Sequence, residues 1–166
     1  GDFAKAIVNT MDIELPVEEE SSRRSSRNKV EKLPMFTDVP TTHRNYKYIE
    51  AVAERGIMTG VGNKKFSPDS TITKAEVATI LVRTLGMQNL APIFNYSTGF
   101  QDDHMIPAWA KDHVYMAKQL GIIDNEPYFY PTRPITKQET AITIVNYINY
   151  LQERLMYDFR ENILNN

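Results

Sequence analysis

The sequence predicts an all-α fold assembled from repeated helical units. The pattern Ile-Thr-Lys-x-Glu occurs at residues 72–76 and again at residues 135–139, 63 positions later. Apolar residues also recur every three to four positions in several stretches, which is typical of amphipathic helices, and no stretch alternates as a half-buried strand would. Self-similarity at a fixed period indicates stacked copies of one supersecondary unit, with function in the surfaces between copies.

The first stretch of the chain predicts a helix followed by a linker. Residues 2–11 carry apolar side chains four positions apart and align with the helix that follows the repeated pattern, so residues 1–15 are predicted to end an earlier repeat. No signal peptide is visible, because the opening residues resemble the inside of a helix. Residues 16–34 are rich in serine and in charges of both signs, which predicts a linker or exposed loop.

The first full copy is predicted to span residues 35–87 and to contain two helices. The first helix, 46–55, is expected to end at Gly56, where glycine suits a left-handed stop, with Ile57 folding back on Val52. The second helix is expected to begin at Thr73 and to end before Gly86. Residues 88–98 are predicted to link this copy to the next.

The second copy is predicted to span residues 99–150. Its first helix covers residues 107–120, and its second begins at Thr136. Apolar residues continue at helical spacing past the end of the copy, so this helix is expected to run to about Arg160. Residues 151–166 are therefore predicted to form a helical C-terminal extension.

The threonines and glutamates of the repeated pattern predict two capping boxes. A threonine before a helix accepts a hydrogen bond from the backbone N–H three residues on, and a glutamate there bonds back to the threonine N–H. This geometry explains Thr73, Glu76, Thr136 and Glu139 without any ligand.

Capping does not explain Lys74 and Lys137, which follow the two threonines. A lysine in the first turn opposes the helix dipole, so its recurrence suggests the binding of an anion beside free N–H groups at the helix start. Plain solvation of both lysines is the alternative. Trp109, the only tryptophan, is predicted either to form an aromatic wall for a sugar ring or to lie in the core, and Arg44 takes its place in the first copy.

Composition narrows the classes of function. The chain has 166 residues and a formal charge of −2, which gives no electrostatic argument for nucleic acid binding. The absence of cysteine excludes disulfides and thiol catalysis, and the three histidines do not show metal spacing, so no cofactor or metal is predicted. No apolar run approaches the roughly 18–20 residues of a membrane span. No catalytic triad or paired carboxylates stand out, so we do not expect an enzyme.

The combined motifs resemble the S-layer homology (SLH) domain. Both copies contain Phe-x-Asp, a helix ending in Gly-Ile, a loop ending in Phe-x-Pro, and then Ile-Thr-Lys-x-Glu before an apolar helix. The resemblance implies a pseudo-threefold prism around a central helix bundle. It also implies an extracellular module that anchors exported proteins to the bacterial cell wall through anionic, often pyruvylated, secondary wall polysaccharide.

The resemblance carries over to particular residues. The family's Thr-Arg-Ala-Glu arginine, which contacts the glycan, corresponds to Lys74 and Lys137, and the tryptophan of the first helix corresponds to Trp109. We therefore expect glycan contact at these residues, at Arg44 and at the motif threonines and glutamates. The alternative is a structural or protein-interaction module with degenerate SLH repeats, in which a domain-swapped dimer would cover exposed apolar surface.

Overall fold

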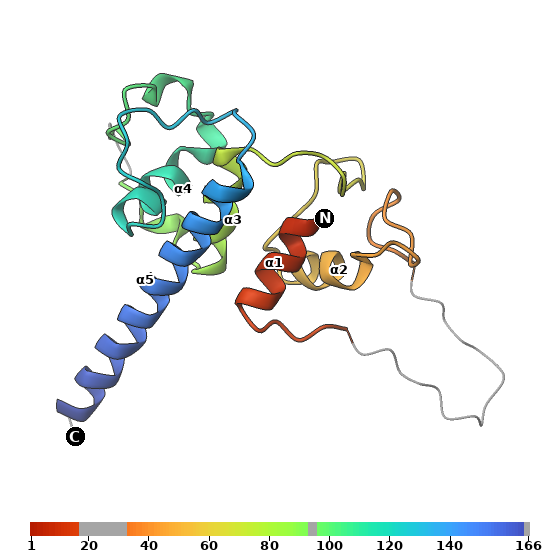
Figure 1. Ribbon diagram of the computed structural model, residues 1–166, viewed down its shortest axis with the longest axis horizontal. Coiled ribbons are helices and arrows are strands. Elements are labelled where there is room, and N and C mark those ends of the chain that lie inside the picture. Colours follow the sequence, from red (N-terminus) through yellow and green to blue (C-terminus); the bar gives the residue numbers. More distant parts are fainter. Residues whose placement is uncertain (17–32, 93–95, 165–166) are drawn as a thin grey trace. The chain divides into compact units, whose positions relative to one another are not determined.

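The computed structural model describes residues 1–16, 33–92 and 96–164, and its regular elements there are helices joined by loops (Figure 1). Within those ranges no β-strand forms, and the only extended pairing is two isolated bridges, so the predicted all-α class is confirmed. The predicted linker 16–34 lies almost entirely outside the described residues. The elements are α1 (Asp2–Thr10), α2 (Tyr46–Glu54), α3 (Lys74–Thr84), η1 (Gln88–Leu90), η2 (Asp103–Met105), α4 (Ala108–Gln119) and α5 (Lys137–Leu164).

The chain forms two compact units, Gly1–Ser70 and Thr71–Asn166. The division falls inside the first sequence copy, between its loop and its second helix. Each unit therefore pairs the last helix of one copy with the first helix of the next: α1 packs against α2, and α3 packs against α4. The packing units are thus offset from the sequence repeats. The domain boundaries expected from the sequence and the threefold prism stay predictions.

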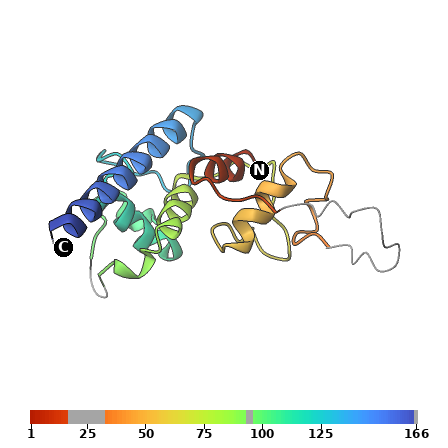
Figure 2. The same ribbon diagram turned by 90° about the horizontal axis from the view of Figure 1, so that it is seen from below.

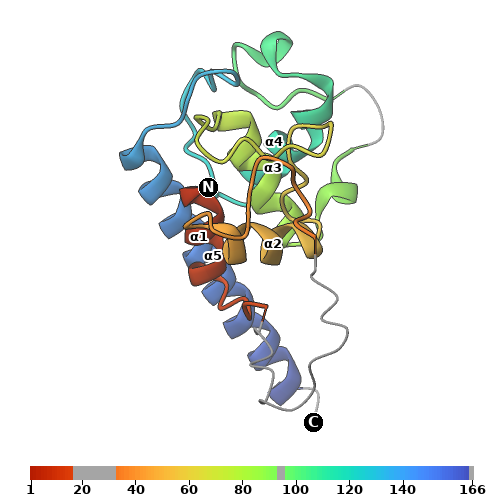
Figure 3. The same ribbon diagram turned by 90° about the vertical axis from the view of Figure 1, so that its right-hand side faces the viewer.

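The core of the first unit lies between α1 and α2 (Figure 3). The side chains of Ile7, Val8, Ile49 and Val52 are buried there, as their helical spacing predicts. The loop before the unit boundary closes over the start of α1, where the N-terminal amine of Gly1 donates a hydrogen bond to the carbonyl of Pro68.

The second unit repeats this arrangement with α3 and α4 (Figure 2). Its buried apolar side chains come from both helices and include Val77, Leu81, Val114 and Ala117. The loop before α5 reaches back to the start of α3, where the N–H of Ala75 donates to the carbonyl of Pro131 at 3.1 Å. Ala75 and Pro131 occupy the positions of Gly1 and Pro68 in the other unit, so one junction contact occurs in both.

The glycine helix stops are confirmed. Gly56 and Gly121 both adopt a φ of 67°, in the left-handed region that residues with a Cβ avoid. The next residue folds back in each case: Ile57 donates its N–H to the carbonyl of Val52 at 2.9 Å, and Ile122 donates to Ala117 at 2.9 Å. These bonds satisfy carbonyls that the helix end would leave without partners.

Helix α5 runs four residues beyond the predicted end, to Leu164, and its C-terminal part extends past α3 and α4 (Figure 1). The helix continues because Asn149 stands where Gly86 ends α3. It is tied to α3 by the buried Tyr147, whose hydroxyl lies 2.7 Å from the Thr84 hydroxyl. No helix in the described ranges is long and apolar enough to cross a membrane.

Candidate functional site

Both predicted capping boxes form. At α3, the Thr73 N–H donates to the Glu76 carboxylate at 2.8 Å, and the Glu76 N–H donates to the Thr73 hydroxyl at 3.3 Å. At α5, the same two bonds join Thr136 and Glu139 at 3.0 and 3.2 Å. The positions of the two helix starts are therefore set by local sequence.

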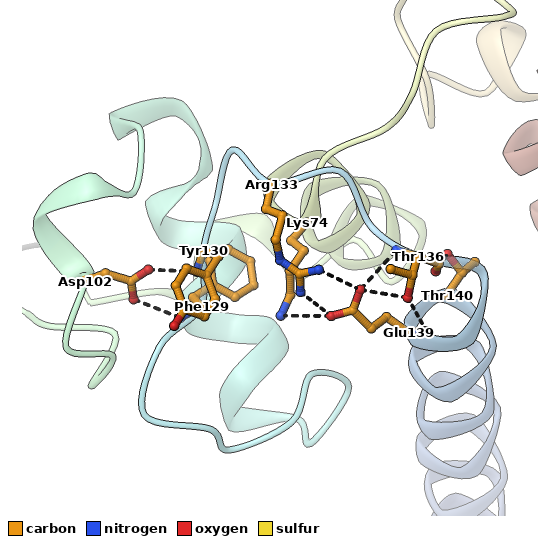
Figure 4. Close-up of polar contacts among 8 residues, drawn as sticks. All are labelled: Lys74, Asp102, Phe129, Tyr130, Arg133, Thr136, Glu139 and Thr140. Carbon is orange, nitrogen blue, oxygen red and sulfur yellow. Dashed lines mark hydrogen bonds and ion pairs between the residues drawn. The ribbon is translucent and has the colours of Figure 1, made fainter.

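The aspartate of Phe-x-Asp holds the loop that carries Phe-x-Pro. Asp102 is buried and accepts hydrogen bonds from the N–H groups of Phe129 and Tyr130 at 2.8 and 2.7 Å (Figure 4). Tyr130 has a φ of 55°, which is uncommon for a bulky residue and needs support from its surroundings. In the first unit, Asp38 makes the same pair of bonds to Phe66 and Ser67. The motif is thus a structural brace.

This braced loop closes the start of α3. Besides the bond from Ala75 to Pro131, the N–H of Lys74 donates to the carbonyl of Arg133 at 3.1 Å. The sequence had suggested free N–H groups beside Lys74 for binding an anion, and for α3 this expectation is wrong because the next repeat supplies the acceptors. Any ligand near Lys74 must therefore contact its side chain.

Two cationic side chains meet one carboxylate at this junction (Figure 4). Lys74 Nζ lies 3.8 Å from Glu139 Oε1 and 5.5 Å from the centroid of the Phe129 ring, and only 17% of its side chain is exposed. Arg133 donates from Nη1 to Glu139 Oε2 at 3.2 Å and from Nη2 to Oε1. Hydrogen bonds from Arg133 first, and then from Thr136, lower the pKa of Glu139 to about 2.

Arg133 is the residue that the sequence reading missed. It occupies the place of Ser70 in the first copy, so comparing the two copies gave a signal: a cation six positions before the capping glutamate in one copy only. Its pairing with Glu139 depends on how the loop folds over the start of α5. The spacing alone does not fix that fold.

A pocket of about 350 Å³ opens beside this cluster within the second unit. Its charged lining includes Lys74 and Arg133 together with three carboxylates, Asp124, Glu126 and Glu139. An aromatic wall is available because Tyr128 lines the pocket and stacks on Tyr130 with 5.7 Å between ring centroids. The other lining residues are Val77, Phe100, Ile123, Phe129, Ile135, Thr136, Gln138, Ile142 and Thr143.

The structure brings together only part of the predicted site. Thr136 and Glu139 join Lys74 at the pocket, whereas Lys137 is exposed at the start of α5 and its ammonium forms no hydrogen bond or ion pair with the described residues. Trp109 is 55% exposed, so its placement in the core, one of the two predicted alternatives, is wrong. It does not line the pocket.

Arg44 lies in the other unit, just before α2, with its side chain 70% exposed. It forms a 3.1 Å ion pair with Asp2, so the two positions that correspond to the family tryptophan differ in both chemistry and surroundings. Thr73 and Glu76 cap α3 and lie outside the lining of the pocket. Among the residues that the structure describes, no group of histidines and carboxylates is arranged to hold a metal ion.

Comparison with known proteins identifies the repeats. The family model for the S-layer homology domain matches residues 36–78 and 99–141, about half of the chain. The chain belongs to the SLH family. SLH domains are non-catalytic modules of bacterial surface proteins that anchor them to the cell wall. The braced loops and capping boxes described above fall within the two matched segments.

The relatives include proteins named as surface-layer proteins and proteins named as enzymes. The chain is 37% identical over 112 residues to "Exoglucanase XynX" of Acetivibrio thermocellus, covering 66% of this chain and 10% of that protein. It is 30% identical over 112 residues to "Surface-layer 125 kDa protein" of Lysinibacillus sphaericus, covering 64% and 9%. It is 27% identical over 116 residues to "S-layer protein EA1" of Bacillus anthracis, covering 69% and 13%.

The chain thus spans about a tenth of the length of these relatives, and the shared part is the SLH segment. The same module occurs beside an enzyme in one protein and in surface-layer proteins in others, so it is independent of the rest of the chain that carries it. Proteins with this module lie outside the cell, at the bacterial cell wall or surface layer, and we assign this chain to that location.

Proposed function

We propose that this chain anchors its protein to the bacterial cell wall by binding an anionic, pyruvylated secondary wall polysaccharide, without catalysis. The observation that carries the proposal is the pocket in the second unit, where Lys74 and Arg133 lie beside Tyr128. Cationic side chains pair with the carboxylate of an acidic sugar, and an aromatic ring packs against the apolar face of a pyranose. Lys74 stands at the position where the family carries its motif cation, and Arg133 and Tyr128 line the same pocket.

The remaining predicted residues have different roles in this proposal. Lys137 is exposed and unpaired within the described ranges, so it is available to a second acidic group of a repeating polymer. Trp109 is exposed enough to stack on a sugar outside the pocket, whereas Arg44 lies in the first unit and pairs with Asp2. The capping threonines and glutamates contribute by fixing the helix starts, and of these four residues we expect direct glycan contact only from Thr136.

Co-sedimentation with purified cell walls tests the proposal. Peptidoglycan that retains its secondary polymer should pellet the wild-type chain, and the same peptidoglycan stripped of the polymer should not. The Lys74→Ala/Lys137→Ala double variant should remain in the supernatant, whereas Lys65→Ala, which removes an exposed lysine of the first unit, should pellet like wild type. Equal sedimentation of wild type and the double variant would contradict the assignment of these lysines.

We propose self-association through α5 as a second function, because one face of this helix is apolar and exposed. Ile142 and Val145 are 40% and 54% exposed, whereas the corresponding residues of α3, Thr79 and Val82, are buried. In each unit the last helix of one repeat packs on the first helix of the next, α1 on α2 and α3 on α4. A second copy that exchanges such a helix would bury the face.

Light scattering across a range of protein concentrations distinguishes this second function from simple anchoring. We expect wild type to increase in mass with concentration and the Val145→Glu variant to remain monomeric, because a charge on the exposed face opposes burial. Glu153→Lys, an exposed charge change on the same helix, serves as the control and should associate like wild type. A wild-type chain that remains monomeric at high concentration would refute self-association.

A further inference from the structure

We propose that Arg133 is the residue that recognises the carboxylate of the wall glycan, and that Glu139 occupies its binding atoms until the glycan arrives. This inference rests on the proposed glycan binding and specifies its chemistry. It differs from the assignment based on the motif lysines, because a lysine ammonium is a point charge and cannot form the two parallel hydrogen bonds that match a carboxylate.

The backbone of Arg133 is held in place. Its carbonyl accepts from the N–H of Lys74 at 3.1 Å, and its own N–H donates to the carbonyl of Tyr130 at 3.1 Å. Pro134 follows and forms an isolated bridge with Thr73. The guanidinium therefore extends from a short segment that is fixed at both sides, which limits the entropy lost when it orders around a ligand.

The present contacts of the guanidinium already have the geometry of carboxylate recognition. Both terminal nitrogens face the two oxygens of Glu139, and the Tyr130 ring lies 5.9 Å from Cζ. The hydrogen bond with Glu139 is the main reason that the pKa of Arg133 is raised. With 42% of its side chain exposed and its place in the pocket lining, Arg133 can be reached by a ligand that enters from solvent.

The two oxygens of Glu139 are not equivalent. Oε2 accepts from the backbone and hydroxyl of Thr136 at 3.0 and 2.9 Å, which makes it part of the capping box, and also from Arg133 Nη1 at 3.2 Å. Oε1 contacts only the cations, Arg133 Nη2 and Lys74 Nζ. A ligand carboxylate that binds the fork of Arg133 would displace both hydrogen bonds from Arg133 and the contact with Lys74, while the two bonds from Thr136 to Oε2 leave the helix cap intact. We therefore assign the Glu139 carboxylate as an internal stand-in for the carboxylate of the glycan.

The charges that line the pocket nearly cancel, so its selectivity for an anion must depend on the geometry of the binding groups. Asp124 and Glu126 also line it, so the lining carries two cationic and three carboxylate groups and does not attract anions by bulk charge. Selectivity for an acidic sugar must then come from the fork of Arg133, while Asp124 and Glu126 line the pocket as acceptors for sugar hydroxyls. The first copy has Ser70 at the position of Arg133, so this chemistry is specific to the second copy.

Two substitutions test the inference in opposite directions. Arg133→Lys keeps the charge but removes the fork, and we expect binding to weaken about tenfold, the effect of losing roughly one charge-assisted hydrogen bond. Glu139→Gln keeps an amide that can serve in a capping box but removes the competing carboxylate, and we expect binding to tighten about three- to tenfold. Glu153→Gln on α5 is the matched control and should bind like wild type.

The probe is secondary wall polymer released from purified walls of Lysinibacillus sphaericus, a species with an SLH relative, compared with the same polymer after mild acid has removed ketal-linked pyruvate. Affinities are measured by titration calorimetry, and thermal unfolding by circular dichroism confirms that each variant is folded. The opposite effects of the two substitutions should appear with native polymer and disappear with acid-treated polymer.

The outcomes separate this inference from the function on which it rests. If wild type binds neither the native polymer nor whole walls, glycan anchoring itself is wrong. If wild type binds the native polymer but Arg133→Lys binds equally well, or Glu139→Gln binds no more tightly, anchoring stands and the role of Arg133 is refuted. Opposite effects that persist with acid-treated polymer would refute carboxylate recognition.

Discussion

Replacing Asp102 with alanine should destabilise the second unit more than any exposed substitution. The buried Asp102 carboxylate accepts from the N–H groups of Phe129 and Tyr130 at 2.8 and 2.7 Å. Alanine leaves both donors without their acceptor, and each unsatisfied buried donor costs about 1–3 kcal/mol. Because Tyr130 is partly exposed and water can reach its donor, we expect a total loss of about 3–4 kcal/mol.

A loss of this size is easy to measure. Small domains have about 5–15 kcal/mol of stability, so Asp102→Ala should remove a large part of it. Trp109 is the only tryptophan and lies in the second unit, so its fluorescence during urea unfolding follows that unit directly. Asp102→Asn, which keeps one acceptor oxygen, should fall between the alanine variant and wild type.

The control for Asp102 is Glu153→Ala, which removes an exposed carboxylate from α5 and should change the unfolding free energy by less than about 0.5 kcal/mol. If Asp102→Ala lies within about 1 kcal/mol of wild type, the aspartate is not the brace of the Phe-x-Pro loop. The motif would then need a different explanation, such as direct contact with a ligand.

Three further outcomes follow from individual contacts in the second unit. Tyr147→Phe removes the 2.7 Å hydroxyl contact with Thr84 and should cost about 1 kcal/mol by urea unfolding, with little further loss on adding Thr84→Val. Gly121→Ala should cost about 1–2 kcal/mol by the same measurement, because an added Cβ opposes the φ of 67°. Burial, and then the nearby charge of Arg83, lower the pKa of His113 below the ordinary histidine value of 6.5. The neutral form is favoured in the folded state, so stability is complete above pH 6.5 and falls as the pH drops below it, and the fall should be smaller in His113→Gln.

Features that depend on neighbouring residues along the chain could be predicted from the sequence. The capping boxes need only a threonine and a glutamate three positions apart, and the helix stop at Gly121 needs only a glycine after an apolar helix. Both predictions are confirmed because hydrogen bonds within a few residues satisfy the groups at the helix ends. The end of α5 could be predicted only approximately, four residues too early, because no glycine or proline occurs between residues 149 and 164 to mark where the helix stops.

Features that join distant residues could not be predicted. The contact of Lys74 with Glu139 connects two copies of the motif, and periodicity gives no information about which copies meet. The offset of the packing units from the sequence copies follows from similar contacts, because the loop before α5, inside the second copy, closes the start of the helix that ends the first. Helical spacing shows on which face of α4 Trp109 lies, but it does not show whether another element covers that face. The exposure of Trp109 therefore could not be predicted.

The junction between copies explains why one family motif contains both a cap and a cation. The cap fixes the start of each last helix locally, but the backbone donors at the start of α3 are satisfied only when the loop of the next copy arrives. That same loop brings Arg133 beside Lys74, so assembly of the pocket and completion of the helix start are one event. A helix start on which no such loop closes would keep its cap and its lysine, yet would lack the second cation. Loss of the junction should therefore abolish recognition of the carboxylate at that copy before it unfolds the helix.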